Sequence, residues 1–192
     1  MNTPAHLLLG TALFARPLRT RVILAAAFGA LVPDLSLYIL GGFSLFVLQI
    51  PPQRVFNELY FPDAWQTVFA IDNSMFIWAA LLAIAIRAKK DYAIALCSAA
   101  LLHLVCDMPL HHDDGRPHFW PLTSWVFESP LSYWDGRHGA QWVAPLEAML
   151  ATLAAMRLCF ARNPTWVKIC ALVLLGAEIW IVSQWLFFFV DT

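Results

Sequence analysis

The chain has 192 residues, of which 60% are hydrophobic and 13% are charged, and its formal net charge is −1. Soluble domains carry about 25% charged residues, and one core could not bury so large an apolar share. The composition therefore excludes an ordinary soluble domain and predicts an integral membrane protein. The near-zero charge and the lack of a basic patch or DNA-reading motif give no indication of a nucleic-acid partner.

Apolar segments predict the helices in chain order. Thr3-Pro4 is typical of an N-cap followed by proline at the first helical position, which predicts a short helix to about Ala15. A second helix is expected to stop at Gly41-Gly42, and the apolar run 43–50 is expected to lie at the interface. Full spans are expected at 20–40, 74–86, 92–110, 142–159 and 166–190. The predicted fold class is all-α: a polytopic membrane helix bundle of about five full spans plus the short N-terminal helix, as one domain over 1–192.

The basic residues predict the orientation of these spans. Three short connections are basic, whereas the long connections 51–73 and 111–141 carry few arginines. The basic residues of the short connections are Arg16, Arg19 and Arg21, then Arg87, Lys89 and Lys90, then Arg157, Arg162 and Lys168. By the positive-inside rule, the short connections face the cytoplasm and the two long loops face outward.

With this orientation, the ionisable residues of the spans lie at a similar depth on the outer side. Ionisable residues inside a membrane are rare, usually face the interior of the bundle, and are candidates for a functional site. Glu178 is not placed in this layer. The residues that are placed there are His6, Asp34, Asp72, His103, Asp107 and Glu147.

The strongest local motif is the pair His103 and Asp107, which lie four residues apart and so share one face of a helix. Imidazole and carboxylate are ligands for zinc or a related divalent ion. A buried histidine bonded to a helical aspartate is the alternative. His111 follows as a further candidate ligand, whereas Gly115 and Pro117 favour a solvated turn for Asp113 and Asp114.

Several motifs together resemble the YdjM-like family of inner-membrane proteins, which are described as LexA-binding, metal-dependent hydrolases. The resemblance covers roughly residues 1–125. The motifs, in order, are His6 with Gly10, Leu31-Val32-Pro33-Asp34, His103-x-x-x-Asp107, Gly115 and Trp120-Pro121.

The resemblance implies that His6, Asp34, His103 and Asp107 form one divalent metal site, with zinc as the expected ion, in the inner membrane of a bacterium. Members of the family usually carry a histidine where this chain has Asn73. Asp72 or His111 is the candidate to replace that ligand, or the site is altered or lost.

The expected activity is hydrolysis of an ester or phosphoester at the outer membrane surface. Glu147 or His112 is the candidate general base, and Arg116 or Arg137 is the candidate for holding an anionic headgroup. The substrate is expected to be lipid-like or a periplasmic small molecule, and the lipid bilayer is the expected partner. The sequence does not indicate the oligomeric state.

The competing hypothesis is a non-enzymatic membrane protein, either associated with transport or structural, in which the same acids and imidazoles form an ion-responsive core. A further alternative is a family member that keeps the fold without the metal. A cobalamin-biosynthesis role has no support in the sequence, because there is no glycine-rich loop that would hold a phosphate.

Overall fold

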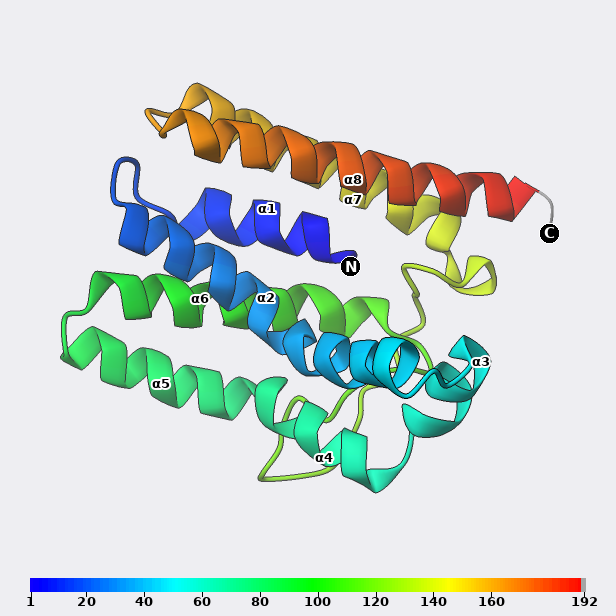
Figure 1. The fold of residues 1–192 in the computed structure, drawn as a ribbon. Coiled ribbons are helices and arrows are strands. Elements are labelled where there is room, and N and C mark those ends of the chain that lie inside the picture. Colours follow the sequence, from blue (N-terminus) through cyan, green and yellow to red (C-terminus); the bar gives the residue numbers. More distant parts are fainter. Residues whose placement is uncertain (191–192) are drawn as a thin grey trace.

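The computed structural model describes the backbone of residues 1–190 and the side chains of residues 1–185, and every regular element in that part is helical (Figure 1). Five helices are long and apolar enough to cross a membrane: Thr20–Val47, Asp63–Arg87, Asp91–Leu110, Ala140–Phe160 and Thr165–Trp185. The N-terminal helix Thr3–Phe14 is shorter. The prediction of an all-α polytopic bundle with five spans and a short N-terminal helix is confirmed, and the chain is a multi-pass membrane protein.

The elements follow one another with few long connections. In chain order they are α1 (Thr3–Phe14), α2 (Thr20–Gly42), the π-helical turn η1 (Phe43–Val47), α3 (Pro52–Arg54), the π-helical turn η2 (Val55–Leu59), α4 (Asp63–Asp72), α5 (Met75–Arg87), α6 (Asp91–Asp107), the 3₁₀ turns η3 (Met108–Leu110) and η4 (Gly136–His138), α7 (Ala140–Phe160) and α8 (Thr165–Val190).

The α-helix α2 ends at Gly42, in agreement with the expected stop at Gly41-Gly42, and the π-helical turn η1 continues the span to Val47. The span ends before Pro51 and Pro52, which lack an N–H group. Each glycine weakens a helix by about 1 kcal/mol relative to alanine. In lipid, however, an open backbone costs several kcal/mol per unsatisfied polar group, so an apolar segment stays helical.

The segment 51–73, expected as a loop, is mostly helical. Pro62 precedes α4, and Asp63 lies in its first turn, where a carboxylate favours the helix N-terminus. Phe69 and Ala70 of α4 are buried. The hydroxyl of Ser74 accepts a hydrogen bond from the Ile77 N–H and so begins α5 directly after α4. Only residues 111–135 form a long connection without regular structure.

The short helix α1 lies at the centre of the bundle. It packs against α2 and α6 on one side and against α7 and α8 on the other (Figure 1). Small and apolar residues line these contacts, such as Ala5 and Leu8 of α1 and Ala151 and Ala155 of α7. Small residues allow membrane helices to approach closely, which is the main source of attraction between them.

Glycine is required at two of these contacts. A Cβ atom on Gly29 of α2 would lie 2.1 Å from the backbone oxygen of Leu96 in α6. A Cβ atom on Gly10 of α1 would lie 2.7 Å from the Cβ atom of Ala30. The helices α1, α2 and α6 are therefore in near-backbone contact, and this contact determines how closely their polar side chains approach.

The short basic connections lie at one end of the bundle, on the left in Figure 1. There Arg16 and Arg19 each place a guanidinium nitrogen 2.6 Å from the carboxylate of Asp91, at the start of α6. The connection from η3 to α7 and the turns that follow α2 lie toward the opposite end.

We expect Gly29→Ala to destabilise the protein by about 1–3 kcal/mol, because the added methyl group meets backbone that cannot move aside. Gly42→Ala is the matched control, since nothing lies within 4 Å of a Cβ atom at that position. The control should be neutral or stabilising by up to about 1 kcal/mol. Thermal or denaturant unfolding in detergent measures both, and equal stability of the two variants would contradict the contact.

Candidate metal centre

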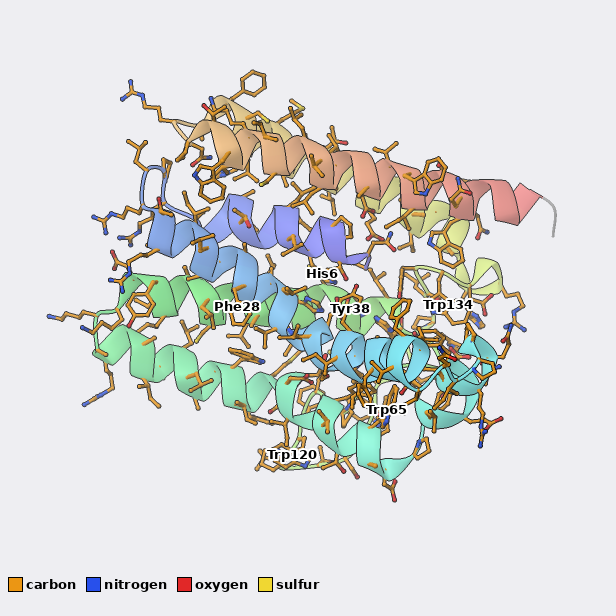
Figure 2. All side chains as sticks on the ribbon, in the orientation of Figure 1. His6, Phe28, Tyr38, Trp65, Trp120 and Trp134 are labelled. Atoms are coloured by element: carbon orange, nitrogen blue, oxygen red, sulfur yellow. The ribbon has the colours of Figure 1, made fainter. Side chains whose placement is uncertain are left out.

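Three helices bring imidazole and carboxylate groups together at the centre of the bundle. His6 comes from the start of α1, Asp34 from α2, and His103 and Asp107 from the end of α6. Figure 2 shows His6 on the side of α1 that faces α2 and α6. Potential ligand atoms of His6, His103 and Asp107 all lie within 4.8 Å of one another, and all three residues are buried.

The distances within this cluster are short. The Nε2 atom of His6 lies 2.8 Å from Oδ1 of Asp107. The Nε2 atom of His103 lies 3.1 Å from Oδ2 of Asp107 and 3.6 Å from Oδ1 of Asp34. The two imidazole rings are stacked, with centroids 3.6 Å apart and planes 9° from parallel. Four of the predicted metal residues therefore meet, although their role as ligands stays a prediction.

The orientation of His103 is fixed by a backbone contact. Its Nδ1 atom lies 2.7 Å from the carbonyl oxygen of Ala30. Because a carbonyl only accepts, Nδ1–H must donate, and a neutral ring then has its lone pair on Nε2. That atom is buried and has no well-directed hydrogen bond, although two carboxylates are near it. Histidines that bind metals commonly donate their second ring nitrogen to a carbonyl in this way.

The donor set fits a divalent cation. A buried lone pair that faces buried carboxylates is unfavourable unless a positive charge compensates the carboxylates. The α-amino group of Met1, 2.6 Å from Oδ1 of Asp107, supplies one such charge. Two imidazoles with two carboxylates is a combination that zinc and related ions accept. The cluster is therefore suited to holding a cation in the place where four side chains converge.

His111 joins the cluster from the connection after α6. Its Nε2 atom lies 3.5 Å from Oδ2 of Asp107, and its Nδ1 atom lies 2.9 Å from Oδ1 of Asp114. Burial alone would raise the pKa of Asp114, but the hydrogen bond and charge of His111 outweigh burial and lower it. Sequence reasoning assigned Asp114 to a solvated turn, although its position three residues after His111 was the available signal.

Asp72 and Asn73 lie beside the cluster and have other partners. Oδ1 of Asp72 accepts a hydrogen bond from the Asn73 amide at 2.8 Å. The same amide nitrogen donates to the carbonyl of Pro33 at 3.1 Å. Asn73 stands where the family resemblance expects a histidine. Its hydrogen bond fixes the backbone of Pro33, the residue before Asp34. Asp72 as a metal ligand stays a prediction without a supporting contact among the described residues.

A pair of buried glutamates lies on the other side of α1. One oxygen of Glu147 accepts from the backbone N–H of Asn2, and the Asn2 amide donates to Glu178 at 3.2 Å. Glu178 is 0% exposed. Sequence analysis left Glu178 outside the polar layer. However, Glu178 lies thirteen residues beyond Thr165 at the start of α8, and Asp34 lies fourteen residues beyond Thr20 at the start of α2, so the two residues occupy similar positions along their helices.

His112 lies in a separate pair. Its ring stacks on His138 with centroids 3.6 Å apart, and its Nδ1 atom lies 2.6 Å from the carbonyl of Ser129. His118 is also buried, and its Nδ1 atom lies 3.1 Å from the carbonyl of Asn73. These contacts order the connection that covers the cluster, and they do not include the cluster's carboxylates.

A cavity of about 310 Å³ opens beside the cluster. Asp34, Asp107 and His111 form part of its wall, together with residues 1–4 at the start of α1. Arg116 lines it as well, as do Tyr38, Tyr60 and Tyr133. A small molecule of this volume could therefore reach the atoms that would hold a cation.

Comparisons of the chain with protein-family models, with curated proteins and with solved structures found no match. The class of protein that fold and site define is a multi-pass helical membrane protein with a buried histidine–aspartate cluster.

We expect the purified protein to retain about one divalent ion per chain, and both His103→Ala and Asp107→Asn to reduce that content to near zero. His138→Ala is the control, because it removes an imidazole from the connection before α7 that pairs with Asp135 and not with the cluster. Elemental analysis of detergent-purified protein measures all four samples. A wild type without metal would contradict the metal centre.

Proposed function

We propose that the protein is a metal-dependent hydrolase of the bacterial inner membrane that cleaves an ester or phosphoester at the outer membrane surface. One observation carries this proposal: the Nδ1 atom of His103 bonds to the carbonyl of Ala30, so that its Nε2 atom faces the carboxylates of Asp34 and Asp107. Such a set of acceptors binds a cation and leaves it accessible from a cavity.

The ligands in this proposal are His6, Asp34, His103 and Asp107, with His111 as a fifth and Asp114 orienting it. When bound, a divalent ion supplies a Lewis acid and lowers the pKa of a water molecule. Zinc is the proposed ion, because imidazole and carboxylate are among its usual ligands.

The two proposed general bases differ in their position. Glu147 is buried and bonded to Asn2, which lines the cavity. His112 is paired with His138 and Ser129 and is not among the residues that line the cavity. Neither residue is itself among those that line the cavity. Because a base must come within hydrogen-bond reach of the water it activates, Glu147 is the nearer candidate, since its partner Asn2 lines the cavity.

The location of the cavity supports a lipid-like or periplasmic substrate. The cluster lies away from the end of the bundle that carries the short basic connections (Figure 1). Basic connections face the cytoplasm by the positive-inside rule, so the cavity belongs to the outer half of the membrane. The five motifs shared with the YdjM-like family support the same class of activity.

We expect the metal-loaded protein to hydrolyse a generic ester probe, either p-nitrophenyl butyrate or bis(p-nitrophenyl) phosphate. A chelator should abolish the activity and added Zn²⁺ should restore it. His103→Ala should reduce the rate by about a hundredfold or more, since even outer-shell changes cost about 10–100-fold. His138→Ala should retain the wild-type rate. Activity that survives complete removal of metal would refute the proposal.

We expect a cysteine at position 122 to react with a membrane-impermeant maleimide from outside the cell, and a cysteine at position 89 to react only after the cell is opened. Leu122 is 75% exposed and Lys89 lies in a short basic connection. Leu122→Cys and Lys89→Cys are placed in a chain whose four native cysteines are replaced. The reverse labelling pattern would invert the topology and exclude a periplasmic substrate.

A further inference from the structure

Arg116 is a buried cation without a carboxylate partner. The residue is 7% exposed, and none of the ion pairs formed among residues 1–185 includes it. Four exposed arginines, in contrast, each pair with a carboxylate; they are Arg16, Arg19, Arg54 and Arg137. Taking a guanidinium out of water costs several kcal/mol unless other groups compensate for the lost hydration.

The contacts of the Arg116 guanidinium are with a backbone carbonyl, two aromatic rings and the Tyr60 hydroxyl. One nitrogen donates to the carbonyl of Pro33 at 3.4 Å, and the guanidinium carbon lies 4.5 Å from the centre of the Phe69 ring. A guanidinium has five N–H donors in a planar fork. The aromatic ring supports the plane of the fork, and these partners do not account for all five donors of a side chain that lines the cavity.

Tyrosine hydroxyls surround the same space. Tyr60 is buried and its hydroxyl donates to the carbonyl of Asp114 at 3.1 Å. Tyr133 also lines the cavity. The Tyr133 ring lies beside that of His111, with ring centroids 5.2 Å apart. A tyrosine hydroxyl can donate as well as accept a hydrogen bond, so Tyr133 offers a donor to an anion in the cavity.

The cavity thus has two chemically different walls. Asp34, Asp107 and His111 form one wall, which is suited to a cation, and Arg116 with Tyr133 forms another, which is suited to an anion. Without a cation the carboxylates would repel an anion, and with a divalent ion in place the two walls attract the same negatively charged group. A phosphoryl group matches both, because it ligates metals and accepts paired hydrogen bonds from an arginine fork.

We propose that Arg116, supported by Tyr133, is an anion-binding subsite that selects a phosphate-bearing ligand over an uncharged ester. The proposal rests on the proposed function, since the metal supplies the second attraction. It narrows that function to phosphoesters and distinguishes buried Arg116 from exposed Arg137, which is occupied by Asp135.

The test is calorimetric titration of inorganic phosphate into the detergent-purified, metal-loaded protein. Arg116→Gln should weaken phosphate binding by about tenfold or more, because it removes a buried charged donor. Arg116→Lys, which keeps the charge without the fork, should give an intermediate loss. Arg137→Gln is the matched control and should change the affinity by less than about twofold.

Metal content and thermal unfolding are measured on every variant, so that a folding defect is recognised. If Arg116→Gln does not fold, Tyr133→Phe replaces it, and this variant should weaken binding by about threefold through loss of one hydroxyl.

Absence of phosphate binding by the wild type would overturn the subsite, as would equal affinity of the wild type and Arg116→Gln. If the wild type holds stoichiometric metal but binds phosphate independently of Arg116, the subsite is refuted and the hydrolase is not. If the protein holds no metal but binds phosphate through Arg116, the metal-dependent hydrolase is refuted and the subsite is not.

A second arm distinguishes a lipid headgroup from a free phosphate. The protein is reconstituted into nanodiscs that contain phosphatidylcholine only or phosphatidylcholine with phosphatidic acid. If phosphatidic acid competes for the subsite, the wild type should bind phosphate more weakly in the phosphatidic acid discs than in the phosphatidylcholine discs, and Arg116→Gln should show no such difference. This result supports the subsite with a lipid phosphate as ligand. Equal Arg116-dependent binding in both discs supports the subsite with a soluble phosphate as ligand.

Discussion

The candidate site depends on the near-backbone contact between α2 and α6 at Gly29 and Leu96. Helices in lipid are not held together by the hydrophobic effect and must gain their attraction from packing and from polar contacts. Here one contact serves both purposes. The residue after Gly29 supplies the carbonyl that fixes His103, and Asp34 lies one helical turn further along the same helix. A wider separation of α2 and α6 would remove the hydrogen bond that orients the His103 ring.

The sequence predicted the helices and the depth of most polar residues, because both follow from the positions of apolar and basic residues along the chain. The depth of a residue does not determine in which direction its side chain points around the helix axis, and so it does not determine the partners of that side chain. Asp72 shares the depth of Asp34 but is bonded to Asn73, whereas His103 and Asp107 meet His6 directly. The helical character of 51–73 was missed because its polar residues and prolines resemble a loop. Arg116 gave no sign in the sequence that it would be buried.

Asn73 orders the backbone next to Asp34. Its side-chain amide donates to the carbonyl of Pro33, and Arg116 donates to the same oxygen. Two donors from separate segments thus hold the residue before Asp34 in place, while His111 approaches the cluster from the connection after α6.

The short length of α1 has a consequence for the whole bundle. Its 12 residues rise by ~18 Å, whereas the hydrocarbon core of a membrane is ~30 Å thick. The cavity lies at the start of this short helix, where residues 1–4 line it together with Tyr38 of α2 and Ile181 of α8. A helix shorter than its neighbours thus places its first turn inside the bundle, where longer spans form the walls of the polar chamber around it.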